Sequence, residues 1–166
     1  MGNQAGRAGG SAGGGGGGSG SGGGCVATIE LRKASQCAEW APDGSGRLAV
    51  TCFDDTLRIF SLGETAESAE SAFDKGTKKM PHADLGPADA KPAIKHCTQT
   101  GRWVVPFRAI WAPAADALLC GGMKRTVEVF DAEKGKKLAS LSSAERMTAI
   151  PSRNAVHASG KAIAAA

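Results

Sequence analysis

Several features that define common protein classes are missing from this 166-residue chain. Its five cysteines, at positions 25, 37, 52, 97 and 120, are odd in number and form no Cys-x-x-Cys pair, which argues for reduced thiols and against a disulfide framework or a zinc site. No apolar run approaches the roughly 20 residues of a membrane span. A phosphate-binding glycine loop and a nucleophile elbow are also missing. We therefore expect no enzyme activity, cofactor, bound metal, membrane association or small-molecule substrate.

Apolar side chains are also scarce in residues 1–24, which hold 14 glycines with mostly serine and alanine between them. Such a tract cannot bury enough apolar surface to offset the entropy lost on ordering. The sequence predicts a disordered tail over 1–24, and a folded part that begins at residue 25.

Acidic side chains are missing between Asp89 and Asp116. Four basic residues fall inside this window, namely Lys91, Lys95, Arg102 and Arg108, so its surplus equals the net charge of +4 of the whole chain. A local basic stretch indicates a polyanionic partner more strongly than a diffuse excess of charge does.

The chain repeats itself. Trp40-Ala41-Pro42 and Trp111-Ala112-Pro113 each precede a β-rich run that ends in an aromatic, after 20 residues at Phe60 and after 19 at Phe130. Recurrence of such a strand–turn–strand unit is typical of β-propeller blades. The repeat position predicts that Trp40 and Trp111 both pack inside the blades.

Hydrophobic patterning predicts strands over 25–31, 36–40, 48–53, 56–62, 104–111, 117–120, 126–130, 137–141 and 146–150. We expect a leading strand and first blade over 25–62, an irregular inter-blade insertion over 63–93, a second blade with a basic loop over 94–145, and a truncated third blade over 146–166. The predicted fold is all-β. About two and a half blades make a fragment of a WD-repeat β-propeller, because a closed one takes typically 4–8.

The basic loop begins within 94–103, where cationic side chains adjoin an aromatic and a glycine, namely Lys95, His96, Gly101, Arg102 and Trp103. Cations neutralise phosphates, an indole or guanidinium can stack on a base, and glycine allows close backbone approach. In the alternative interpretation, Trp103 begins a strand and packs in the core, with Arg102 on the solvated face.

The wording of residues 100–113 (TGRWVVPFRAIWAP) closely resembles a signature of the family of WD repeat-containing protein 76 and the fungal DNA damage-binding proteins, related to damage-specific DNA-binding protein 2. The resemblance continues through 122–125, 127–130 and 151–157, with 53–60 similar to the preceding blade. It covers roughly 25–166 and is strongest over 94–111. It implies the C-terminal part of a seven-bladed propeller.

The resemblance also implies a DNA-contacting hairpin whose tip falls on Gly101, Arg102 and Trp103, because in the damage-specific relative such a hairpin precedes the strand that starts at Pro106. Lys95, His96 and Arg108 would flank it, and Lys124 and Arg125 would contact phosphate if their turn opens on the same face. The Arg–Trp pair matches the protein 76 branch better than the damage-specific relative. A nuclear location and a partner of duplex DNA, damaged or not, follow from the same resemblance.

A scaffold that binds chromatin proteins, or a substrate receptor of a cullin–RING ubiquitin ligase, without direct DNA binding is the alternative function. Family members dock the ligase adaptor through a Trp-Asp-x-Arg blade ending, which neither 60–63 (FSLG) nor 130–133 (FDAE) keeps. Asp54-Asp55 resembles a carboxylate pair, but its turn position predicts hydrogen bonds to its own backbone.

Overall fold

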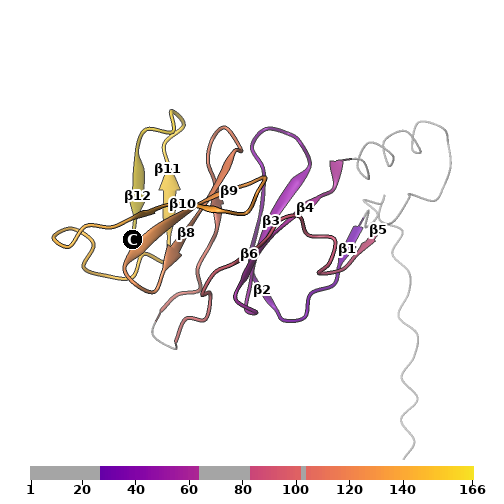
Figure 1. Ribbon diagram of the computed structural model, residues 1–166, viewed down its shortest axis with the longest axis horizontal. Coiled ribbons are helices and arrows are strands. Elements are labelled where there is room, and N and C mark those ends of the chain that lie inside the picture. The colour runs from indigo at the N-terminus through magenta and orange to yellow at the C-terminus, as the bar shows by residue number, and fades with distance from the viewer. Residues whose placement is uncertain (1–26, 64–82, 102–103) are drawn as a thin grey trace, which may run out of the picture.

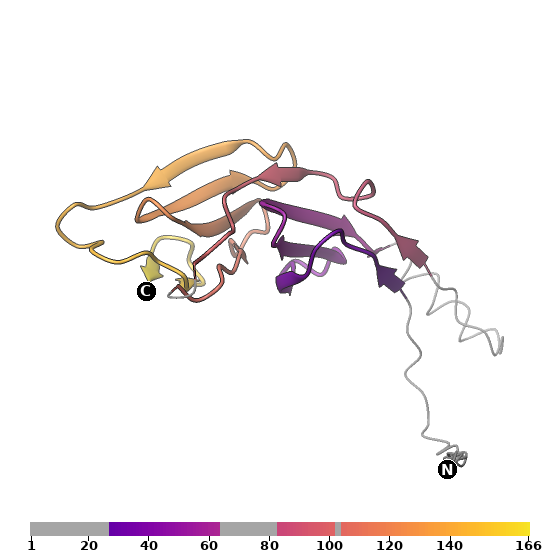
Figure 2. The ribbon, with the colours of Figure 1, turned by 90° about the horizontal axis from the view of Figure 1, so that it is seen from below.

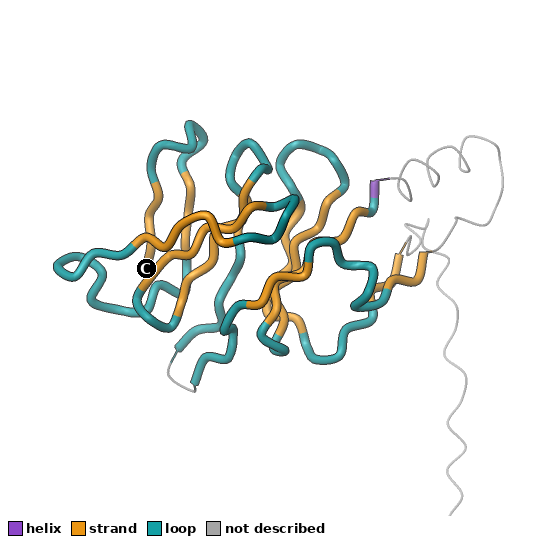
Figure 3. Tube along the Cα trace, in the orientation of Figure 1, coloured by secondary structure: helices purple, strands orange, loops and turns teal. Residues whose placement is uncertain are grey.

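The computed structural model describes residues 27–63, 83–101 and 104–166. Strands are the main elements of these ranges (Figures 1 and 3). In chain order they are β1 (Ala27–Ile29), β2 (Ser35–Trp40), β3 (Arg47–Cys52), β4 (Thr56–Ser61), β5 (Ala83–Leu85), β6 (Ala93–Lys95), β7 (Ile110–Trp111), β8 (Ala117–Gly122), β9 (Thr126–Asp131), β10 (Lys137–Leu141), β11 (Asn154–Val156) and β12 (Ile163–Ala165).

Two four-stranded antiparallel sheets form the centre of the molecule, in the orders β2-β3-β4-β6 and β10-β9-β8-β7. The hairpin β11-β12 lies on one side of them, and the parallel pair β1-β5 on the other. Figures 1 and 2 show the sheets side by side, as blades of a propeller are arranged. The predicted all-β fold and the partial propeller are confirmed.

The core lies between the two blades because their middle strands are buried on both faces. Every residue of β8 is buried, as are the last four of β3. One cluster joins Leu57 and Ile59 of the first blade to Phe107, Trp111 and Leu118 of the second. Burying these side chains holds one blade against the other. Each Å² of apolar surface removed from water contributes about 25 cal/mol to the free energy of folding.

Both blades make the same tight turn between their second and third strands. Cys52 lies opposite Thr56 in one, and Gly122 opposite Thr126 in the other, with three residues between in each case. The third of these residues has a positive φ, 59° at Asp55 and 60° at Arg125. The two turns therefore stand at corresponding ends of the two sheets.

The two repeated tryptophans differ in burial. Trp111 is 5% exposed, and its Nε1 donates to the carbonyl of Glu39 in the first blade at 2.9 Å. Trp40, expected to be packed likewise, is 57% exposed. Trp111 is covered because a blade lies on its side of the sheet, whereas the described residues place no blade beside β2 at Trp40.

Three strand boundaries also differ from the sequence prediction. Residues 104–109 form no strand, since Pro106 lacks an N–H and the N–H of Ala109 bonds instead to Oγ1 of Thr51 at 3.0 Å. Residues 146–150 form none, and the third unit starts at β11. Ile94 and Lys95 lie in β6, which pairs with β4, so they complete the first blade rather than open the second.

Candidate nucleic-acid interface

The segment from Cys97 to Ala109, which links the two blades, is anchored at its start by Thr98. The backbone N–H of Thr98 donates to Oδ1 of Asp55 at 2.9 Å, and its hydroxyl donates to the Cys52 carbonyl at 2.6 Å. The Gln36 amide donates to the Thr98 carbonyl at 2.8 Å. These bonds fix the base of the segment to the first blade, while its other end meets the second.

His96 lies inside the protein, contrary to the prediction that it contacts DNA. It is 6% exposed. Its Nε2 lies 2.8 Å from the Gly121 carbonyl oxygen and its Nδ1 lies 3.1 Å from Oε2 of Glu128. The ring also packs against Phe107 and Phe130. With both nitrogens within hydrogen-bond distance of protein oxygens, His96 is a structural link between the blades, and little of its side chain is left to meet a ligand.

Gly121 is the point where three segments converge. A Cβ there would lie 1.7 Å from the Pro151 carbonyl oxygen, a distance that no side chain can occupy, and 3.2 Å from the Phe107 ring, which is a tight contact. Its own carbonyl receives the His96 bond. Glycine is required because the backbone of 151 and the side chain of Phe107 both press on this position. The β8–β9 turn, the β6–β7 segment and residues 151–154 are thereby brought together.

Lys124 and Arg125 are exposed on the β8–β9 turn. The N–H of Arg125 closes the turn on the Gly122 carbonyl at 3.1 Å. Because Gly121 precedes this turn and binds His96, the turn stands at the same end of the sheets as the β6–β7 segment. The turn therefore lies at the end of the sheets that the expected phosphate contact requires, and the contact itself stays a prediction.

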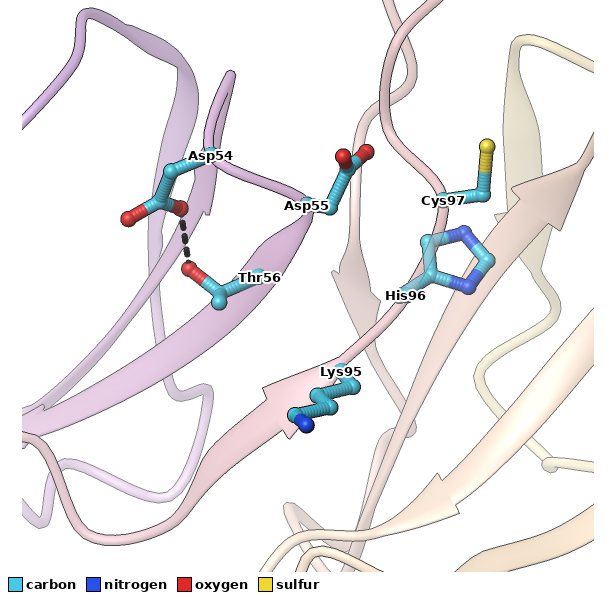
Figure 4. Close-up of a pocket in the computed structure, with 6 residues that line it drawn as sticks. All are labelled: Asp54, Asp55, Thr56, Lys95, His96 and Cys97. Atoms are coloured by element: carbon cyan, nitrogen blue, oxygen red, sulfur yellow. Dashed lines mark hydrogen bonds between the residues drawn. The ribbon is translucent and has the colours of Figure 1, made fainter.

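The corresponding turn of the first blade carries the acids Asp54 and Asp55. They line a shallow hollow of about 420 Å³ together with Thr56, Lys95, His96 and Cys97. Figure 4 shows Asp55 directed toward the segment that carries His96 and Cys97. Asp54 accepts from Thr56, and forms an ion pair of 2.7 Å with Arg58. Asp55 accepts from Thr98 and from the Gln99 amide, the latter at 2.8 Å. Asp54 thus bonds within its own turn and strand, whereas the partners of Asp55 lie 43 and 44 residues further along the chain.

These partners lower the pKa values of both carboxyls. The backbone N–H of Thr98 has the largest effect on Asp55 and, with Gln99, brings its pKa below the usual range. Partial burial raises the pKa of Asp54, but hydrogen bonds from Thr56 and Arg58 outweigh it and leave the pKa lowered. Both side chains are therefore anionic near neutral pH and serve to hold the turn.

The remaining predicted site residues are distributed unevenly. Lys95 is exposed at the end of β6, and Gly101 is exposed with its carbonyl 3.2 Å from the Val104 nitrogen. Arg108 is exposed but its Nε donates to Sγ of Cys37 at 3.3 Å, toward β2. Arg102 and Trp103 lie outside the described residues.

Arg153 was given no role by the sequence, and it adds a guanidinium to this end. It is exposed, and its Nη1 donates to the Pro106 carbonyl at 2.8 Å, across to the β6–β7 segment. The only signal for it in the sequence is its place in the run 151–157 that resembles the family. Arg153 is placed at this end of the sheets because Pro151, two residues before it, packs against Gly121.

The part of the chain that the structure describes contains neither a metal-ligand cluster nor a membrane-spanning helix. There, no three His, Cys, Asp or Glu side chains gather closely enough to hold a metal ion. Across the same ranges no helix has the length and apolar character needed to cross a bilayer.

Known proteins similar to this chain are named either as DNA damage-binding or as WD repeat-containing proteins. No protein-family model matches. DNA damage-binding protein CMR1 of Debaryomyces hansenii is 34% identical over 67% of this chain, and that of Phaeosphaeria nodorum is 33% identical over 76%. WD repeat-containing protein 76 of Mus musculus is 30% identical over 80%. This chain is a homologue of these proteins.

The homology confirms the resemblance that the sequence predicts. The chain spans 20%, 22% and 18% of the length of these three relatives, so it corresponds to about a fifth of each. Among solved structures, the WD40 domain of Toxoplasma gondii coronin is similar with a TM-score of 0.42 and 20% identity, covering 67% of this chain and 21% of that one.

Proposed function

We propose that this chain is the DNA-contacting part of a nuclear WD-repeat protein that acts in the response to DNA damage, and that it binds without catalysing a reaction. The observation that carries the proposal is the homology to proteins named DNA damage-binding, together with a basic end of the sheets. Lys124 and Arg125 are exposed at that end, beside a segment without acidic residues.

The physical basis is phosphate neutralisation. Each Lys or Arg that meets a phosphate releases counterions from DNA, which makes binding favourable and dependent on salt. In this proposal Lys124 and Arg125 contact phosphates, and Lys95 and Arg108 flank them. Gly101, Arg102 and Trp103 form the contact at the tip, where the indole stacks on a base or enters a distorted step.

Two contacts hold the described residues on either side of this tip. Thr98 binds the first blade before it, and Arg153 holds the Pro106 carbonyl after it. The Gly101 carbonyl and the Val104 nitrogen, on either side of Arg102 and Trp103, lie 3.2 Å apart. A loop held at both ends loses little entropy on binding, which favours recognition by its tip.

The test is fluorescence anisotropy of undamaged and damaged duplexes with the full chain over a salt series. We expect log-linear weakening of binding with salt, and a loss of affinity in Arg102→Ala/Trp103→Ala that leaves the melting temperature unchanged. Unaltered affinity in that variant, or no binding by the wild type, would overturn the proposal. In that case chromatin proteins and the cullin–RING adaptor become the partners to examine.

A further inference from the structure

The two tight turns at this end of the sheets are equivalent in position and opposite in charge. Asp54 and Asp55 stand where Lys124 and Arg125 stand in the next blade, as the strand registers and the matching φ angles of 59° and 60° show. One turn carries two negative charges and the other two positive charges. A polyanion that meets this end of the molecule therefore meets a steep change of charge from one blade to the next.

The acidic turn is engaged within the protein, whereas the basic turn is open. Both carboxyls of the first turn bind side chains or backbone of their own blade and of the following segment. No carboxylate among the described residues lies within 4.0 Å of the Lys124 amine or the Arg125 guanidinium. The two cations are thus exposed with their donors directed to solvent.

Arg153 extends the basic turn away from the first blade. Pro151 and Asn154, on either side of it in the chain, both lie against Gly121, three residues before Lys124. One nitrogen of its guanidinium binds the Pro106 carbonyl at 2.8 Å. A guanidinium has five N–H donors, so the others are free for a phosphate oxygen.

We propose that the phosphate path of bound duplex is one-sided: it crosses the β8–β9 turn at Lys124 and Arg125, continues to Arg153, and avoids the β3–β4 turn. This rests on the proposed DNA binding and adds the orientation of the duplex. Asp54 is balanced by its ion pair with Arg58, but Asp55 has no cationic partner among the described residues. An anionic phosphate within a Debye length of about 8 Å of Asp55 would be repelled, so the path lies beyond that distance. Lys95 lines the same hollow as the two acids, away from this path, and contributes less to affinity than Lys124 or Arg125.

The test compares matched variants of the full chain in the salt series. Lys124→Gln/Arg125→Asn removes two charges, and asparagine keeps the positive φ of position 125 at little cost. Lys134→Gln/Lys136→Gln is the control, since it removes the same charge beyond Asp131, at the opposite end of β9. We expect the first variant to lower the slope of log affinity against log salt by about 2, Arg153→Gln by about 1, and the control by none.

Asp55→Asn tests the acidic side of the proposal. Its affinity should rise by less than about twofold, because the duplex does not pass over that turn. Equal slopes in the turn variant and the control, or a large gain in Asp55→Asn, would overturn the one-sided path while DNA binding itself stands. Absence of salt-dependent binding in the wild type would overturn both proposals together.

Discussion

The carbonyl oxygen of Gly121 lies 2.8 Å from Nε2 of His96, and this bond joins the residue that follows the last strand of the first blade to the second strand of the next. A carbonyl oxygen only accepts, so Nε2 donates. The same glycine meets Pro151 and Phe107. The basic end of the molecule is therefore assembled around one backbone position, and changes there act on all three segments.

A side chain at Gly121 should disrupt this assembly. In Gly121→Ala the new Cβ would meet the Pro151 carbonyl oxygen at 1.7 Å, which is backbone and cannot move aside cheaply. We expect the free energy of unfolding to fall by about 3 kcal/mol. Chemical denaturation measures it, with Gly101→Ala as control, because nothing lies within 4 Å of a Cβ at Gly101. Equal stability of the two variants would contradict the packing described.

His96 should matter for stability and not for DNA contact. His96→Ala removes the hydrogen bond to Gly121, the contact with Glu128 and the packing on Phe107 and Phe130. A loss of about 2–4 kcal/mol follows, whereas Lys95→Ala, one residue away and exposed, should cost less than about 0.5 kcal/mol. The melting temperatures distinguish the two variants. An unchanged melting temperature in His96→Ala would contradict the burial of the ring.

The two repeated tryptophans should respond differently to truncation. Trp111→Ala empties a buried site, loses the bond to Glu39 and removes the ring beneath the Arg47 guanidinium, which lies 5.0 Å from its centroid. We expect a cost of about 3–5 kcal/mol. Trp40→Ala should cost about 1 kcal/mol or less in this chain, because the indole is 57% exposed. Denaturation midpoints that shift equally would show that Trp40 is covered in solution.

Acid should destabilise the first blade through Asp55. Its pKa lies below the ordinary 3.8 because of the Thr98 N–H and Gln99. A lowered pKa in the folded state means that this carboxylate stabilises the protein above pH 3.8, and that the stabilisation is lost as the pH falls through the folded value. The melting temperature of wild type should therefore drop faster below pH 4 than that of Asp55→Asn. If the melting temperatures of the wild type and Asp55→Asn fall in parallel with pH, Asp55 does not stabilise the fold in this way.

The sequence predicted those parts of the fold that depend on neighbouring residues. The limits of β10 match the prediction, and the apolar run of β3 is buried as expected. What it missed depends on distant partners. His96 is buried because it contacts Gly121 and Glu128, which lie 25 and 32 residues away in the chain. The backbone N–H of Ala109 bonds to Thr51, 58 residues away. Such pairings follow from how the blades meet, which no local pattern records.

The candidate site shows the same division. The sequence alone predicted the basic stretch between Asp89 and Asp116 with Gly101, and the pair Lys124-Arg125. Arg153 was not singled out, because nothing in its local sequence marks it as facing the β6–β7 segment. The contrast between the acidic and basic turns also needed the strand registers, which show that the two turns are equivalent.

Protection of a thiol on the β8–β9 turn from alkylation by duplex DNA tests the central claim most directly. The substitution Met123→Cys places that thiol beside Lys124 and Arg125, at a position that is 38% exposed. Burial raises the pKa of Cys120 to about 12 and makes it an unreactive internal reference, and Cys97, exposed in the hollow beside Asp55, is the reference that duplex leaves open. Alkylation of each cysteine is followed by mass spectrometry in the full chain. We predict that saturating duplex slows the reaction of the introduced thiol several-fold and that high salt restores it. An unchanged rate at position 123 at every duplex concentration would contradict DNA binding at this end of the sheets.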